Sequence, residues 1–170
     1  MNKIILTLLF FSSCVALFFN LYFFPEFRLL VFLPFLSLAM HRLSFFNTLK
    51  LAFLSGIVLD LLSIDLPMGF HVLSYLLATS FFYSQKKFLF DDKLFSLALF
   101  MIPFSCFTTL IERVLLFFCE RELPLTWKSV SSDLLLMPIF DALFAILWFT
   151  IPLRVYRYWK KRKVPLSEEA

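Results

Sequence analysis

The chain has 170 residues, a formal net charge of +4 and 61% hydrophobic residues, with a mean hydropathy of +0.88 and only 16% charged residues. These values lie well outside the range of soluble globular domains, so they exclude a water-soluble enzyme or binding module and indicate a protein whose solvent is a lipid bilayer. Because there is no Gly/Ser linker, internal repeat or low-complexity tract, we expect a single membrane domain over residues 1–170 with no soluble domain attached.

The first apolar run, residues 4–24, predicts a membrane-spanning helix rather than a removable secretion signal. Lys3 precedes the run, and Ser12-Ser13-Cys14 faintly resembles a lipoprotein cleavage site. The apolar stretch nevertheless continues without a break to Phe24, which is too long for the hydrophobic region of a signal peptide, and no small-residue cleavage site follows it. We therefore expect the segment to stay in the protein as its first helix.

Five further apolar runs follow, and a membrane-spanning helix needs about 20 mostly apolar residues. The sequence predicts an all-α compact bundle of six transmembrane helices. Their expected ranges are 4–24, 28–40, 48–63, 67–84, 94–118 and 132–153, and a basic tail follows at 154–170. The second and third runs are short, so they are expected to cross only where neighbouring helices protect them or the bilayer is locally thin.

The basic residues indicate the orientation, because Lys and Arg in short loops are retained on the cytoplasmic side. With six spans and both termini in the cytoplasm, the cytoplasmic side carries twelve basic residues and the outer side three. The twelve are Lys3, Arg42, Lys50, Lys86, Lys87, Lys93, Arg154, Arg157, Lys160, Lys161, Arg162 and Lys163, and the three are Arg28, Arg121 and Lys128. This basic rim is expected to contact anionic lipid headgroups, and no nucleic-acid role is expected.

Few ionisable side chains lie inside the expected spans, where each is costly unless it is paired or hydrated. They are Asp60, His71, Glu112, Arg113, Asp133 and Asp141. At about 1.5 Å per residue, all six fall in the outer half of the membrane or near its middle. In one interpretation they line a polar cleft that is open to the outside and binds a small ligand or a segment of a partner. In the other, Arg113 neutralises one or two aspartates, the set locks helix packing, and Glu112 and Asp133 reach the interface. The sequence does not decide between these interpretations.

The three cysteines, Cys14, Cys106 and Cys119, lie in or at the edge of the expected spans at no metal-like spacing. Cysteines in such positions are often small buried hydrophobic residues. We expect no metal site and no cofactor.

The only two glycines of the chain, Gly56 and Gly69, lie on either side of Asp60. Gly56 and Asp60 are four residues apart and therefore share a helix face. A neighbouring helix can then approach over Gly56, while Asp60 provides a hydrogen bond. Pro67 is expected to begin the fourth helix, and Gly69 to lie in its first turn, where it lets another backbone come close. The third and fourth spans are thus predicted to form a tight hairpin whose tip faces outward.

These residues resemble a known family. The segments that carry the resemblance are His41-Arg42, the run Leu54-Ser55-Gly56-Ile57-Val58-Leu59-Asp60-Leu61-Leu62-Ser63, and the run Leu66-Pro67-Met68-Gly69-Phe70-His71-Val72-Leu73. Together they resemble the central segment of the rod-shape-determining MreD proteins, which are small polytopic inner-membrane proteins of the bacterial cell-elongation machinery. A fainter similarity continues through Trp127-Lys128-Ser129-Val130, Pro138 and the basic tail after Arg154. The chain departs from the family at Ile64-Asp65, where MreD proteins usually have a small residue.

The resemblance implies a non-enzymatic role in assembly at the bacterial inner membrane. MreD proteins are regarded as partners of MreC, a single-span protein with a large periplasmic part. Their wider complex links MreB filaments to the RodA glycosyltransferase and an elongation-specific transpeptidase. On this basis Gly56, Asp60 and Gly69 would hold the outward hairpin, and Arg113 would be the counter-ion in a polar layer that also contains His71, Asp133 and Asp141.

Two alternatives come from other functional classes. The first is the substrate-binding membrane subunit of an energy-coupling vitamin transporter, which also has about six helices. MreD proteins are thought to share that general fold, so architecture does not separate the two. Such subunits usually offer several outer-loop tryptophans and small-residue motifs, whereas the expected outer loop, residues 120–132, has only Trp127 as an aromatic. The second is a lipid-processing enzyme, for which Asp60 or Asp141 could be the acid or base, but no second catalytic group is evident.

Overall fold

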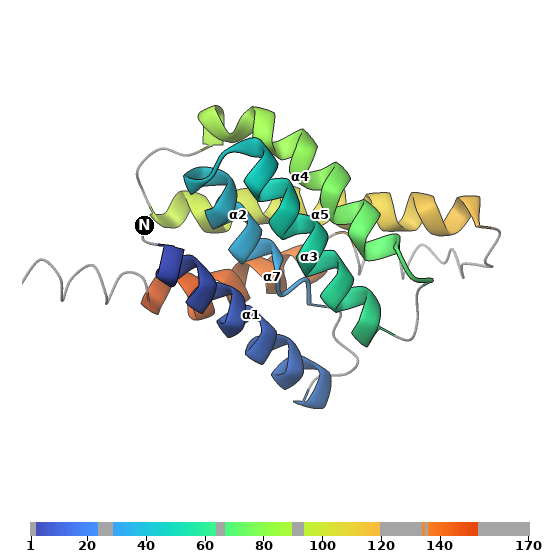
Figure 1. Cartoon of the computed structure of the whole chain (residues 1–170), viewed down its shortest axis with the longest axis horizontal. Helices are drawn as coiled ribbons and strands as arrows, with labels where there is room; N and C mark the ends of the chain where they lie inside the picture. The colour runs from blue at the N-terminus through green and yellow to red at the C-terminus, as the bar shows by residue number, and fades with distance from the viewer. Residues whose placement is uncertain are drawn as a thin grey trace, which may run out of the picture.

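The computed structural model describes residues 3–23, 29–63, 67–89, 94–119, 134 and 136–152, and the regular structure within these residues is entirely helical (Figure 1). The elements are α1 (Lys3–Phe23), α2 (Leu33–Arg42), α3 (Phe45–Leu62), α4 (Phe70–Leu89), α5 (Leu94–Phe118), α7 (Met137–Ala145) and the π-helical segment η2 (Ile146–Thr150). The predicted all-α class is therefore confirmed for the described part of the chain, and the predicted range 94–118 coincides with α5.

Three of these helices are long and apolar enough to cross a membrane. Their apolar stretches are Leu6–Phe23, Phe45–Leu62 and Leu99–Phe118, and Met137–Thr150 forms a shorter apolar helix. By length and composition, the protein is therefore a helical membrane protein. Figure 1 shows that successive helices run in alternating directions, so that the C-terminal ends of α1, α3 and α5 lie toward the same side of the bundle.

The helix within the second predicted span, 28–40, begins and ends later than expected. The helix there, α2, has ten residues, which at about 1.5 Å per residue is roughly half the thickness of the hydrocarbon core. Pro34 lies in its first turn, where a proline favours the start of a helix. Residues 29–32 precede α2 as non-helical backbone and a turn. The side chains of Leu33, Phe35, Leu36, Ala39 and Met40 are all completely buried. The element thus lies at the centre of the bundle, where neighbouring helices cover it.

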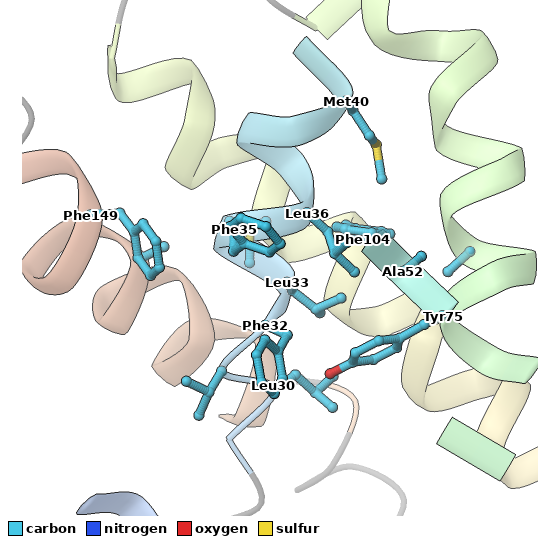
Figure 2. Packing of buried hydrophobic residues seen from close by; sticks show 14 of the residues in the cluster. Leu30, Phe32, Leu33, Phe35, Leu36, Met40, Ala52, Tyr75, Phe104 and Phe149 are labelled. Carbon is cyan, nitrogen blue, oxygen red and sulfur yellow. The ribbon is translucent and has the colours of Figure 1, made fainter. Parts of the chain in front are cut away.

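The packing around α2 is dominated by phenylalanine. The rings of Phe32, Phe35, Phe104 and Phe149 are fully buried (Figure 2). On α4, Phe82 packs edge-on against Phe100 of α5, with the ring centroids 5.4 Å apart. Bulky side chains of this kind keep helix axes well separated, so a close contact between two backbones requires a residue without a side chain.

Helix α1 lies at the edge of the bundle and packs on α2 (Figure 1). Its buried residues are Ser13, Ala16, Leu17 and Asn20, which follow the i, i+3, i+4, i+7 pattern of a single helix face. A side-chain hydrogen bond from Trp148 Nε1 to Ser12 Oγ, 2.9 Å long, joins the same helix to η2. The first predicted helix is therefore present and docked along one stripe.

Candidate functional site

Helices α3 and α4 touch at Gly56. A Cβ atom built on Gly56 would lie 2.5 Å from the Cα atom of Val72 and 2.8 Å from its backbone nitrogen. Real Cβ atoms essentially never approach another heavy atom more closely than 3.0 Å, and a backbone cannot move aside as a flexible side chain can. Gly56 therefore permits the close approach of a neighbouring helix that its spacing from Asp60 predicts.

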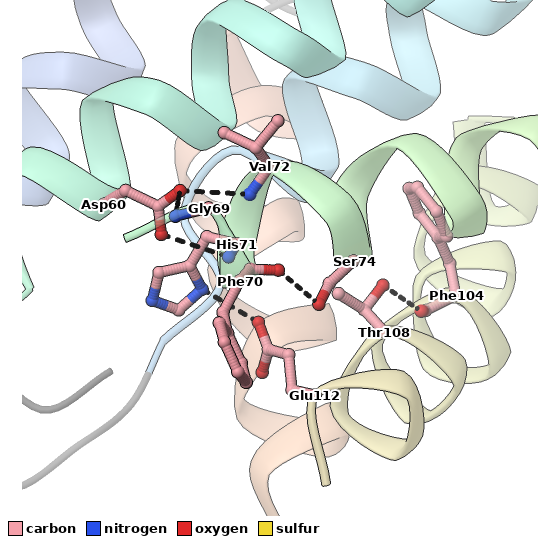
Figure 3. Close-up of polar contacts among 9 residues, drawn as sticks. All are labelled: Asp60, Gly69, Phe70, His71, Val72, Ser74, Phe104, Thr108 and Glu112. Atoms are coloured by element: carbon pink, nitrogen blue, oxygen red, sulfur yellow. Dashed lines mark hydrogen bonds and ion pairs between the residues drawn. The ribbon is translucent and has the colours of Figure 1, made fainter. Parts of the chain in front are cut away.

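Asp60 lies one turn farther along α3 and receives the first amides of α4 (Figure 3). Its Oδ2 atom accepts hydrogen bonds from the backbone N–H groups of Gly69 at 2.9 Å and Val72 at 3.3 Å. Its Oδ1 atom accepts one from the N–H of His71 at 3.1 Å. The carboxylate is only 7% exposed. A negative charge is favourable beside the positive end of a helix dipole, so Asp60 caps α4 from a different helix.

The remaining amides at the start of α4 are also satisfied. The N–H of Phe70 donates to the carbonyl oxygen of Pro67 at 3.3 Å, and the N–H of Leu73 donates to that of Gly69 at 2.9 Å. The first four N–H groups of a helix have no partner within the helix. Here each of the four N–H groups of residues 70–73 has an acceptor. For His71 and Val72 that acceptor is the Asp60 carboxylate.

Gly69 has a different role from the one that the sequence suggested. It precedes α4 rather than lying in its first turn, and a Cβ atom there would have no neighbour within 4 Å. Its φ angle is +97°, a backbone conformation that side chains rarely adopt but glycine adopts readily. The glycine is therefore needed for the turn between α3 and α4 and not for a close backbone contact.

His71 and Glu112 join α4 to α5. The Nδ1 atom of His71 lies 2.9 Å from the Oε1 atom of Glu112 (Figure 3). Both side chains are buried, with exposed fractions of 5% and 1%. The hypothesis that Glu112 reaches the membrane interface is therefore wrong, because α5 continues for six residues beyond it and the side chain is directed to His71 inside the bundle.

Asp141, on α7, holds the segment that leads into α2. Its Oδ1 atom accepts a hydrogen bond from the backbone N–H of Leu30 at 2.9 Å, and its Oδ2 atom accepts one from the hydroxyl of Ser105 on α5. Non-helical backbone is tolerated at membrane depth only where its polar groups are satisfied within the protein. The carboxylate, which is 1% exposed, thus provides a partner for the amide of Leu30 in the chain that enters the buried helix α2.

The expected counter-ion of one or two aspartates is Arg113. It lies half-buried on α5, and it is not among the groups that contact Asp60 or Asp141. Backbone amides and a hydroxyl group donate to both of these carboxylates, and a pairing of Arg113 with Asp133 stays a prediction. Asp133 lies outside the described residues, as do the expected outer loop 120–132 and the tail 154–170.

Two of the polar contacts between helices in the described residues centre on α5. Ser105 and Glu112 lie seven residues apart on α5, on one face and two turns apart. Each attaches a different neighbour, Asp141 of α7 and His71 of α4. In the residues that the structure describes, no group of three or more His, Cys, Asp or Glu side chains could hold a metal ion. Sequence reasoning placed Glu112 in the membrane but missed its pairing.

No protein-family model matches the chain, and comparison with curated proteins and with solved structures found no similar protein.

Proposed function

We propose that the protein is a non-enzymatic membrane component of the bacterial cell-shape and wall-elongation complex, similar to the MreD proteins, and that it binds an MreC-like single-span partner. The observation that supports this proposal is the convergence of Gly56, Asp60, Gly69 and His71 on one contact between α3 and α4. These four residues belong to the segment that resembles MreD. In the fold, all four lie at the same contact between α3 and α4.

The hydrogen bonds of the two buried aspartates, Asp60 and Asp141, favour a role in assembly over a role in catalysis. An acid or base must be able to reach the proton that it transfers. Both oxygens of Asp60 accept hydrogen bonds from backbone amides, and those of Asp141 accept from a backbone amide and a hydroxyl group. These carboxylates stabilise the start of α4 and the segment ahead of α2, which suits a protein that presents a fixed helical surface to other membrane helices.

The proposed topology has six spans with both termini in the cytoplasm of a bacterial cell, and it directs the tip of the α3–α4 hairpin outward. At that tip, Leu61 and Met68 are 65% and 73% exposed. A single membrane helix can pack against such apolar side chains. In this proposal the MreC-like partner contacts the hairpin, while MreB, RodA and the elongation transpeptidase join through the wider complex and lipids surround the rest.

Co-purification from mild detergent tests the proposal, with tryptophan introduced at exposed positions so that the fold is kept. Leu61→Trp and Met68→Trp should reduce recovery of the MreC-like protein several-fold. Phe46→Trp is the matched control, because Phe46 is 74% exposed at the opposite end of α3 and should not affect recovery. If the wild-type protein recovers no wall-synthesis protein, the proposal fails, and a bound vitamin in the purified protein would instead identify a transporter subunit.

A further inference from the structure

Lys50 is a cation on the lipid-facing side of a membrane helix. Helix α3 has 18 residues and is therefore about 27 Å long, close to the thickness of the hydrocarbon core. Lys50 is exposed, and the periodicity of the helix places it opposite the buried residues Thr48, Ala52, Ser55, Gly56, Leu59 and Asp60. Its neighbours on the same face, three and four residues away, are Phe46, Phe53 and Leu54, which are all exposed. The cation thus lies among apolar side chains that face lipid.

A charge at this position is costly unless it reaches water or meets an anion. Lys50 is the sixth residue of α3, so its Cα atom lies about 8 Å from the start of the helix along the helix axis. A charged side chain at such a depth in hydrocarbon needs a partner or a path to the membrane surface. The acidic side chains that the structure describes, Asp60, Glu112 and Asp141, are all buried in contacts with other helices. Lys50 therefore needs an anion that these carboxylates do not provide.

The direction of the Lys50 side chain favours the membrane surface at the start of α3. The Cα–Cβ bonds of a helix tilt toward its N-terminus. A lysine can lay its methylene groups along apolar surface while its ammonium group reaches the headgroups. Phe46, one turn nearer the start of α3, offers such apolar surface because its ring is exposed. We therefore expect the ammonium group at the level of the turn between α2 and α3.

A second cation lies at the same turn. Arg42 is the last residue of α2, and α3 begins three residues later. Its side chain is exposed. On α4, the hydroxyl group of Tyr83 donates to the carbonyl oxygen of Leu43 at 3.2 Å, and the Tyr83 ring packs edge-on against Phe45 with the ring centroids 5.1 Å apart. The turn that follows Arg42 is thus held against α4.

We propose that Arg42 and Lys50 form a binding site for an anionic phospholipid, whose phosphate group they contact and whose acyl chains lie along Phe53 and Leu54. Guanidinium and ammonium groups both bind phosphate in proteins. The site combines two cations with lipid-facing apolar side chains, and this combination matches an amphiphile rather than a free phosphate ion. It differs from the general attraction of the basic rim for anionic lipids, because two particular positions supply the charge. The site depends on the membrane character of the chain and not on the proposed partner.

Native mass spectrometry of the protein in detergent tests this site, with phosphatidylglycerol and phosphatidylcholine offered at equal concentrations. The wild type should retain mainly phosphatidylglycerol. Arg42→Gln and Lys50→Gln should each weaken phosphatidylglycerol binding about five-fold. The matched control is Lys160→Gln, which makes the same change of net charge in the basic tail and should leave binding unchanged. Equal losses in all three variants would mean that only net charge matters, and equal retention of the two lipids by the wild type would also overturn the proposal.

Two further measurements separate a lipid site from a free-phosphate site and from an effect on folding. Phosphatidylglycerol should raise the melting temperature in detergent, and inorganic phosphate should not; an equal rise with inorganic phosphate would reject the lipid as the ligand. Lys50→Leu places an apolar side chain on a lipid-facing surface, so it should keep the wild-type melting temperature without added lipid and yet lose the preference for phosphatidylglycerol. Lys50→Arg keeps a cation and should keep the preference. If Lys50→Leu binds phosphatidylglycerol as the wild type does, the inference is wrong.

Discussion

The Oδ2 atom of Asp60 lies 2.9 Å from the backbone nitrogen of Gly69, so an aspartate of one helix fixes the turn that begins the next. The same arrangement recurs at Asp141, whose Oδ1 atom accepts the amide of Leu30 ahead of α2. In both places a carboxylate satisfies a backbone group that would otherwise lack a partner inside the membrane domain. The buried charges therefore explain how short or closely packed helices begin in this bundle.

Replacing Asp60 by asparagine should destabilise the protein. The amide side chain has one acceptor oxygen, and its NH₂ group would face backbone N–H groups that need an acceptor. We expect a loss of about 1–3 kcal/mol, measured as a lower apparent melting temperature in detergent. Asn47→Ala is the control on α3, because Asn47 is exposed and its change should have little effect. Equal melting temperatures for both variants would show that the cap contributes nothing.

The two glycines should respond differently to substitution. Gly56→Ala places a methyl group against the backbone of Val72, so α3 and α4 must separate, at a cost of about 1–3 kcal/mol. Gly69→Ala meets no neighbour but must adopt a φ of +97°. Asparagine tolerates positive φ better than alanine does. Gly69→Asn should therefore recover part of the stability lost in Gly69→Ala, whereas Gly56→Asn should be worse than Gly56→Ala. Thermal unfolding of the four variants tests this order.

The features that the sequence predicts correctly are local ones. The apolar run 94–118 gives the bounds of α5, and the four-residue spacing of Gly56 and Asp60 places them on one face because helix periodicity acts within a single element. In contrast, a run of apolar residues looks the same whether it faces lipid or other helices, so the sequence did not show that α2 lies at the centre of the bundle. Pro34 was the available signal that the helix begins late.

Contacts between distant parts of the chain could not be predicted. His71 and Glu112 are 41 residues apart, and Leu30 and Asp141 are 111 residues apart. Without the arrangement of the helices in space, a buried carboxylate suggests a cation as its partner, and Arg113 was the nearest choice. Asp60 and Asp141 instead accept hydrogen bonds from backbone amides, which every residue except proline supplies and which the sequence therefore does not single out.

Because α2 is buried, truncating a phenylalanine on α2 should destabilise the protein more than truncating an exposed phenylalanine on α1. Phe35 is completely buried on α2, whereas Phe18 on α1 is 59% exposed. Lipid is as apolar as the protein core, so truncating Phe35 mainly opens a cavity. We expect Phe35→Ala to cost about 2 kcal/mol and Phe18→Ala to change the melting temperature little. A similar loss in both variants would contradict the central position of α2.

The Asp141 carboxylate has two partners of different kinds, the hydroxyl group of Ser105 and the backbone amide of Leu30. This difference allows a last prediction. Ser105→Ala removes one hydrogen bond, for which membrane proteins show losses of about 0.6–1.7 kcal/mol. Asp141→Leu also leaves the amide of Leu30 without its acceptor, so it should cost more, about 3 kcal/mol. In the double variant the Asp141 carboxylate is already absent, so the Ser105 hydroxyl group has no hydrogen bond to it that could be lost. Its removal should then have almost no further effect, giving a coupling energy of about 0.5–2 kcal/mol in a double-mutant cycle of thermal stabilities. Strictly additive losses would mean that the hydroxyl and the carboxylate act independently, and that Asp141 does not join α5 to the start of α2.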